Sequence, residues 1–261
     1  MPEHVAPSEE ERAIILQTLV ELDQLLDGLP CRLTACSTCT TPLPLPAARK
    51  RADQYNDVGF NSFFKSGWKR FYLKWYGDSH PSAMKLCPRT TELVQGIGSI
   101  KAAMFAELPP GSKLVRHRDP YAGSYRYHLG LDTPNDAACY INVDGERYAW
   151  RDGEAVMFDE TYIHYAENAT EHNRIILFCD IERPMKYRWA EAFNRWFSRN
   201  VMAAAGSPND AGDKTGGLNR AFTRLYKIRL RGKALKKRNR TRYYLEKWAI
   251  FAALAAIFLL I

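Results

Sequence analysis

The sequence lacks the features that mark several common classes of protein. Met1 to Glu10 contains no apolar core of the kind that a secretory signal peptide needs, so we expect the catalytic part to stay in a reducing cytoplasm. There is no G-x-S-x-G nucleophile elbow. His117-Arg118-Asp119 matches part of the kinase catalytic loop, but Ser124 stands where that loop needs Asn, and no glycine-rich loop accompanies it. These absences argue against a serine hydrolase and against a kinase.

Cysteine is present without a complete metal or disulfide pattern. Cys31, Cys36 and Cys39 have the C-x4-C-x2-C spacing with which plant-type iron–sulfur ligation begins. The next cysteine is Cys87, too far along the chain to complete that set. We therefore expect free thiols rather than a cluster or a disulfide framework.

Acidic residues are almost absent from one stretch near the end of the chain. Residues 218–247 contain twelve Lys/Arg and one acid, Glu246. A basic segment usually raises nucleic acid as a partner. Here, however, the fourteen residues 248–261 follow without one polar side chain. This combination is typical of attraction to anionic lipids, so we expect inner-membrane lipids as a partner and no nucleic acid.

The apolar end is short for a membrane span. A helix of that length reaches about 21 Å, whereas the hydrocarbon core is roughly 30 Å thick. Counting back to Tyr243 lengthens it, with Lys247 and Glu246 reaching toward the interface. The segment is expected to span the membrane or to dip into it, and a buried terminal helix is the alternative. The basic flank predicts that the body faces the cytoplasm.

Composition divides the chain into five parts. Residues 1–55 contain an expected helix over Glu11–Leu29 and a loop rich in Pro, Thr and Cys. The other parts are a strand-rich domain (56–185), a helix and linker (186–217), a basic juxtamembrane segment (218–247) and an apolar membrane segment (248–261). The expected helix runs from Tyr187 to Ala205, with several aromatic side chains on one side.

The strand-rich domain has the pattern of a mainly β fold. Short apolar segments predict strands at 100–108, 113–118, 125–131, 138–143, 146–150, 154–158, 162–167 and 174–181. Asp144-Gly145 and Asp152-Gly153 are hairpin signals. A helix is expected over 81–95, broken at Pro88. Strands this short and this regularly spaced indicate a sandwich or a barrel.

The stretch from Trp68 to Tyr76 is aromatic and basic, and it alternates as a strand does. One face would carry Trp68, Arg70 and Lys74. We weigh two interpretations. These residues are candidates to bind an anionic substrate, or the strand is simply amphipathic with solvated cations.

His117, Asp119 and His164 are the candidate metal ligands. Positions i and i+2 of a strand point the same way, so His117 and Asp119 converge without a special turn. Two histidines and one carboxylate form the facial triad of non-haem Fe(II) oxygenases, which leaves coordination positions open for a keto acid and O2. H-x-D alone is a weak signal, and chance matches are common.

Arg174 adds to this signal. It opens the apolar strand that follows His164, where a guanidinium suits the distal carboxylate of 2-oxoglutarate. Arg126 and His128 share an i, i+2 face and supply further donors to that cosubstrate. Alternatively, Arg174 is simply a solvated charge at the start of a strand. The combination of H-x-D, a later histidine and this arginine favours the iron site.

Several segments together resemble a known family. The segments are Asn56–Lys65, Pro109–Leu114, His117–Pro120, Arg126–Leu131, Trp150–Asp159, Glu160–His164 and Asp180–Pro184. They are similar to the aspartyl/asparaginyl β-hydroxylases, and within that family to the bacterial lipid A hydroxylases. Residues 1–48 lack the apolar segment with which lipid A hydroxylases usually begin.

The resemblance implies a double-stranded β-helix (a jelly roll, as in cupins) with flanking helices and a C-terminal membrane-associated helix. It implies a dioxygenase that uses Fe(II), 2-oxoglutarate and O2. His117 and His164 match the iron-ligand histidines, and Arg126, His128 and Arg174 match the positions that hold 2-oxoglutarate. The carboxylate at Asp119 favours the lipid branch over the peptide branch.

The function expected from this resemblance is hydroxylation of the 2-position of a secondary acyl chain of lipid A at the bacterial inner membrane, on its cytoplasmic side. An ornithine-lipid hydroxylase and a peptidyl aspartyl/asparaginyl β-hydroxylase are alternatives. A non-catalytic, membrane-tethered metal-binding barrel is an alternative of another class. The sequence does not indicate an oligomeric state.

Overall fold

The computed structural model describes residues 56–249. The expectations for residues 1–55, with their three cysteines, and for residues 250–261 lie outside this range. Within it, no helix is both long enough and apolar enough to cross a bilayer. The strands are β1 (Lys69–Trp75), β2 (Asp78–Ser79), β3 (Ile100–Leu108), β4 (Lys113–His117), β5 (Ser124–Asp132), β6 (Cys139–Val143), β7 (Glu146–Ala149), β8 (Ala155–Phe158), β9 (His164–Asn168) and β10 (Arg174–Glu182).

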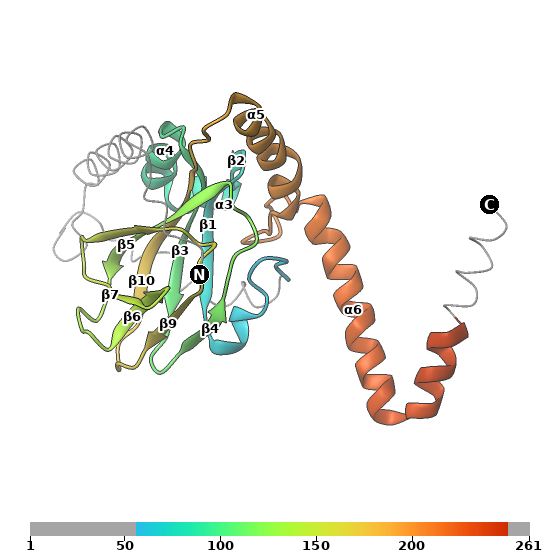
Figure 1. Ribbon diagram of the computed structural model, residues 1–261. Coiled ribbons are helices and arrows are strands. Elements are labelled where there is room, and N and C mark those ends of the chain that lie inside the picture. Colours follow the sequence, from blue (N-terminus) through green and yellow to red (C-terminus); the bar gives the residue numbers. More distant parts are fainter. Residues whose placement is uncertain (1–55, 250–261) are drawn as a thin grey trace.

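The strands form two antiparallel sheets (Figure 1). One has the order β2-β1-β3-β10-β5-β8 and the other the order β4-β9-β6-β7. From β3 to β10 the chain alternates between the sheets, except at the β6–β7 hairpin. This is a jelly roll extended at one edge by β1 and β2, and the predicted mainly β jelly-roll fold is confirmed.

The helices flank this body. They are α3 (Pro81–Leu86), α4 (Pro88–Gly96), α5 (Arg188–Phe197) and α6 (Gly217–Arg238), with short helical turns at Phe63–Ser66, Ser198–Met202 and Ala203–Ala205. The predicted break at Pro88 is confirmed, because Pro88 is the first residue of α4. In Figure 1, α6 projects away from the sheets.

One hairpin signal is confirmed and one is wrong. Asp144 and Gly145 both have positive φ and join β6 to β7 as a two-residue hairpin. Asp152-Gly153 joins β7 to β8, which lie in different sheets. The Asp152 carboxylate instead accepts hydrogen bonds from Thr133 and Asn135, which holds the chain where it crosses between the sheets.

Two hydrophobic clusters cover the two faces of the larger sheet. Along β3, Ala103 and Phe105 join the cluster that packs beneath α3 and α4, whereas Met104 and Ala106 join the cluster between the sheets. Strand periodicity of two residues explains this division. The inner cluster surrounds the candidate site.

Strand β1 is buried rather than solvated. Arg70 is 1% exposed and Lys74 9% exposed, so the expected face of solvated cations is wrong. A register shift between Tyr72 and Lys74 turns Trp75 to the side of Tyr72, whose ring it contacts. A period-two pattern cannot anticipate such an irregularity.

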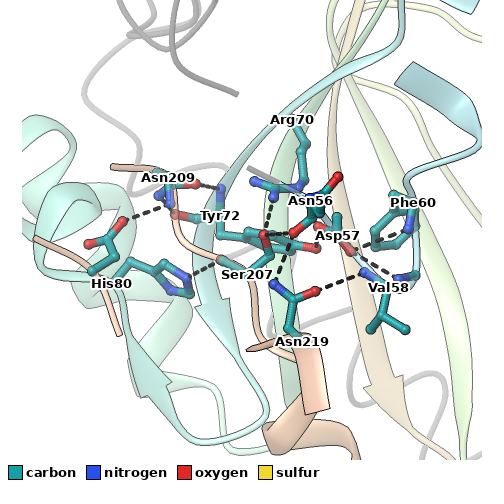
Figure 2. Close-up of polar contacts among 12 residues, drawn as sticks. Asn56, Asp57, Val58, Phe60, Arg70, Tyr72, His80, Ser207, Asn209 and Asn219 are labelled. Atoms are coloured by element: carbon teal, nitrogen blue, oxygen red, sulfur yellow. Dashed lines mark hydrogen bonds and ion pairs between the residues drawn. The ribbon is translucent and has the colours of Figure 1, made fainter. Parts of the chain in front are cut away.

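The predicted linker at 206–217 is also wrong, because this segment is built into the body. Ser207 is fully buried and accepts a hydrogen bond from Arg70 Nη2 at 2.6 Å. Asn209 pairs with both the N–H and the C=O of Tyr72 (Figure 2). His80 is buried, and its Nε2 donates to the Ser207 carbonyl. Much of what holds the segment is side-chain hydrogen bonding, so its polar composition suggested a linker.

Residues on both sides of this segment complete the network in Figure 2. Asp57 forms a buried ion pair with Arg70 at 2.6 Å and accepts a hydrogen bond from the Tyr72 hydroxyl. Asn219, in the first turn of α6, bonds the backbone of Asn56 and Val58. The base of α6 is therefore fixed to the jelly roll.

Candidate metal centre

His117, Asp119 and His164 converge where β4 ends and β9 begins, in the smaller sheet. His117 and His164 are register partners across β4 and β9. One ligand atom from each of the three residues lies within 4.8 Å of the others. Asp119 lies just beyond the end of β4, where its N–H donates to the carbonyl of Glu160. The three predicted ligands are thus brought together, and the arrangement fits a facial triad.

Each histidine is oriented by the backbone carbonyl two residues before it. Nδ1 of His117 lies 2.7 Å from the carbonyl of Val115, and Nδ1 of His164 lies 3.0 Å from the carbonyl of Tyr162. Because a carbonyl only accepts, each Nδ1 carries a proton and each Nε2 keeps its lone pair for a metal. Burial lowers the pKa of His164, which favours the neutral form that ligation needs.

Arg126 binds the carboxylate of Asp119 and fixes its orientation. Its Nη2 donates to Asp119 Oδ2 at 2.8 Å and also to Glu160. Its Nε forms an ion pair with Asp180 at 3.0 Å. Glu160 and Asp180 are themselves fixed by hydrogen bonds from Ser124 and Tyr76. The guanidinium predicted to hold cosubstrate is therefore engaged by three carboxylates and positions a metal ligand.

Beside the triad, a cavity between the sheets contains buried polar atoms that lack partners. Among the described residues, both ring nitrogens of His128, Nε1 of Trp150 and Nε of Arg174 have no hydrogen-bond partner. All three residues line the same cavity as His117 and His164. A buried donor without a hydrogen-bond partner lowers the stability of the folded protein, so in a native structure a ligand, water or ion usually supplies the partner.

The electrostatics of this cavity favour an anion. Burial lowers the pKa of Arg174 to about 10, so the guanidinium stays charged at neutral pH. Burial, aided by the charges of Arg174 and Arg126, lowers the pKa of His128 well below its usual value. The cavity lining therefore combines two guanidinium groups, Arg174 and the carboxylate-bound Arg126, with the neutral groups of His128 and Trp150.

The remaining wall of the cavity is apolar. On the side of His117 it consists of Phe60, Phe63, Trp68 and Leu114. The ring of Phe63 packs edge-on at 4.9 Å from that of His117. This surface suits a hydrocarbon chain.

Trp68, Arg70 and Lys74, the candidates to bind an anionic substrate, have different surroundings. Trp68 lines the cavity, as an apolar wall. Arg70 is enclosed by Asp57 and Ser207, and neither Arg70 nor Lys74 is among the residues that line this cavity. Lys74 instead lines a second pocket, together with Lys101, Arg195 and Arg199, so the three candidates do not share one surface.

Sequence reasoning missed Trp150, Glu160 and Asp180 as parts of the site. Trp150 supplies a donor, and the guanidinium of Arg174 lies 4.3 Å from its ring. All three residues stand in segments that resemble the family, and that was their only signal. The two carboxylates act at the site by holding Arg126.

Sequence comparisons identify proteins that are similar to this chain. The model of the aspartyl/asparaginyl β-hydroxylase family matches residues 44–184. An ornithine lipid ester-linked acyl 2-hydroxylase from Rhizobium tropici is 41% identical over 121 residues, which cover 46% of this chain and 43% of that protein. The human aspartate β-hydroxylase domain-containing protein 2 is 32% identical over 136 residues, covering 48% and 36%. The chain thus spans less than half the length of each of these relatives.

Among solved structures, a cupin domain of a transcriptional regulator from Enterobacter cloacae is similar over 45% of this chain and 98% of that domain. The sequences are 13% identical and the TM-score is 0.31.

Proposed function

The chain belongs to the aspartyl/asparaginyl β-hydroxylase family, and on that premise we propose that it is an Fe(II)- and 2-oxoglutarate-dependent dioxygenase that hydroxylates an acyl chain of a membrane lipid. The observation that carries this proposal is the set of partnerless N–H donors beside the triad, one each on His128, Trp150 and Arg174. A redox metal alone would leave these donors unsatisfied, whereas a dicarboxylate cosubstrate supplies acceptors for them.

The residues fit Fe(II). His117 and His164 would offer Nε2, and Asp119 would offer the oxygen that Arg126 does not bind. Two imidazoles and one carboxylate leave several coordination positions open, unlike a four-ligand structural zinc site.

The residues also fit 2-oxoglutarate. Arg174 would hold the distal carboxylate, because its guanidinium is buried and charged. His128 and Trp150 would donate to the cosubstrate from the two sides of the same cavity. Phe158 and Phe178 pack around the ring of His128 and exclude water from this end.

When bound, Fe(II), 2-oxoglutarate and O2 supply the oxidation, which converts a C–H bond to C–OH and 2-oxoglutarate to succinate and CO2. The protein contributes position and shielding. Arg126 keeps one oxygen of Asp119 occupied, which fixes the direction of the other. The aromatic wall of Phe60, Phe63 and Trp68 would hold the acyl chain beside the metal.

The apolar wall favours an acyl chain over a peptidyl Asp or Asn. The polar groups of the described cavity lining are the triad histidines, the two arginines, His128, Trp150 Nε1 and the half-exposed Tyr165. Arg126 is held by carboxylates, and Arg174 and His128 are assigned to the cosubstrate. Little remains to satisfy a polar substrate side chain, and a hydrocarbon needs no such partner.

The relative from R. tropici favours an ornithine lipid as the substrate, hydroxylated at carbon 2 of its ester-linked acyl chain. Lipid A is the second candidate, because it carries the same chemical group, an acyl chain bound through an ester. With either lipid we propose that the domain works at the cytoplasmic side of the inner membrane.

The experiment compares substrates directly. The full chain is incubated with Fe(II), 2-oxoglutarate and mixed micelles that contain ornithine lipid, lipid A, or an Asp/Asn peptide. We expect succinate to form in proportion to ornithine lipid that gains one oxygen, located at carbon 2 by fragmentation in the mass spectrometer. Turnover of lipid A alone would change the headgroup assignment. Turnover of the peptide alone would refute a lipid substrate, and no turnover at all would favour a non-catalytic metal-binding protein.

A further inference from the structure

Helix α5 exposes an aromatic face that no other described part of the chain covers. Trp189 is 73% exposed, Phe193 57% and Trp196 55%, and Tyr187, just before the helix, is 55% exposed. The rings stack in pairs, Tyr187 on Trp189 and Phe193 on Trp196. Large apolar side chains that gather on one exposed face usually mark an interaction surface.

The opposite face of α5 is fixed to the jelly roll. Asn194 is buried, where it donates to the carbonyl of Gly123 and accepts from the Tyr121 hydroxyl. Phe197 stacks on the Tyr121 ring at 5.4 Å. A Cβ at Gly123 would lie 2.0 Å from Asn194, so only glycine permits this approach. The exposure of the aromatic face is therefore set by how the helix packs.

The charges around this face are positive. Lys186, Arg188 and Arg199 are exposed beside it, and the one acid of the helix, Glu191, is paired with Arg195. Helix α6 follows with nine Lys/Arg and no acid. A second copy of the chain would bring like charges together, whereas an anionic lipid surface would neutralise them.

The types of side chain also favour a bilayer. Trp and Tyr concentrate at the membrane–water interface, where the ring is buried and the polar edge stays hydrated. An amphipathic helix with aromatic residues on one face and cations at its border lies in the plane of the interface.

We propose that α5 is an interfacial membrane anchor: Tyr187, Trp189, Phe193 and Trp196 insert among the headgroups of an anionic bilayer while neighbouring cations bind the phosphates. The anchor is separate from the C-terminal apolar segment. It would also hold the candidate metal site near the bilayer surface, because α5 packs on Tyr121, two residues from Asp119. The inference goes beyond the proposed reaction and does not depend on which lipid is hydroxylated.

The test locates these rings in the membrane. Trp189 and Trp196 are exposed, as is Trp248 near the end of the described chain, whereas Trp68 and Trp150 are buried. We would measure quenching of tryptophan fluorescence by brominated lipid in vesicles of phosphatidylcholine with phosphatidylglycerol, using full-length W248F. The matched control is W189F/W196F/W248F, which keeps apolar rings on the helix but removes the exposed fluorophores. Strong quenching of W248F and its loss in the control are expected; equal quenching of both would overturn the proposal.

A second measurement covers affinity. Full-length W189S/F193S/W196S should partition into the same vesicles about tenfold less than the wild type or worse, because its apolar face is removed. M84S/L86S, which changes exposed apolar residues of α3, should partition as the wild type does. If the triple variant binds vesicles normally, or if it only converts a dimer to a monomer, the face is not a membrane anchor. The vesicles contain neither proposed substrate, so failure here is distinct from failure of the proposed reaction.

Discussion

Asp119 takes part in two interactions at once. One oxygen accepts from Arg126 at 2.8 Å, and the other lies 3.7 Å from Nε2 of His117, on the side where a metal would bind. Its carboxylate is half-exposed and lies beyond the end of β4. The arginine behind it thus sets the direction of the ligand without taking its place.

Asp119→Ala should abolish Fe(II) binding while leaving the fold intact. Arg126 keeps Glu160 and Asp180 as partners in the variant, so no buried charge is stranded. We expect Fe(II) affinity, measured by anaerobic titration, to fall about a hundredfold or more, since one of the three protein ligands is lost. Asp132→Ala, at an exposed carboxylate, is the control. Unchanged affinity of Asp119→Ala would remove Asp119 from the triad.

Arg174 is the buried cation that we assign to 2-oxoglutarate. Arg174→Gln should raise the KM for 2-oxoglutarate by about ten- to a hundredfold, because a charge-assisted hydrogen bond contributes about 1.5–3 kcal/mol. The KM for lipid should change little. The exposed Arg151 provides the control Arg151→Gln. An Arg174→Gln enzyme whose KM for 2-oxoglutarate is normal would contradict this assignment.

The segment 206–217 covers the edge of β1 at Tyr72. Asn209 accepts from the Tyr72 N–H at 2.7 Å and donates to the Tyr72 carbonyl at 2.8 Å, as a neighbouring strand would. It also donates to Ser82. One amide side chain therefore covers the edge of β1 at its irregularity and joins it to α3.

Asn209→Ala should lower the free energy of unfolding by about 2–3 kcal/mol, since it strands the buried backbone groups of Tyr72. Chemical denaturation monitored by circular dichroism measures this loss. Asn200→Ala removes one exposed side-chain hydrogen bond and should cost less than about 0.5 kcal/mol. Equal losses in the two variants would mean that Asn209 is not a structural link.

Local sequence patterns predicted the strands of the jelly roll well. The strands from β3 to β10 were predicted to within about two residues, because alternation and turn signals are local properties. The triad was predicted from H-x-D on an expected strand, a later histidine and the family resemblance, although β4 ends at His117 and Asp119 lies just beyond it. Partnerships such as Asn209 with Tyr72, or Arg126 with Asp180, join residues far apart in the sequence by polar contacts, and no local pattern encodes them.

Positive charge is concentrated in one part of the chain. Residues 218–247 carry twelve of the Lys/Arg and a single acid. Of α6, only Asn219 is buried, so the helix leaves the body with its cations exposed. Together with the aromatic face of α5, the proposed anchor, this helix leads us to expect two kinds of attraction to a membrane, one electrostatic and one apolar.

Salt should separate these two attractions. Arg220, Arg224, Lys227 and Arg231 lie on one face of α6, and their replacement by Gln should weaken binding to anionic vesicles about a hundredfold or more at low salt, at about 1 kcal/mol for each cation. Because screening removes this term at high salt, the wild type and this variant should converge there. W189S/F193S/W196S should behave in the opposite way, with its deficit persisting at high salt. Both variants keep residues 248–261, so vesicle sedimentation across a salt series compares them directly. If the aromatic deficit vanished at high salt, or the basic deficit persisted, the division of roles between α5 and α6 would be wrong.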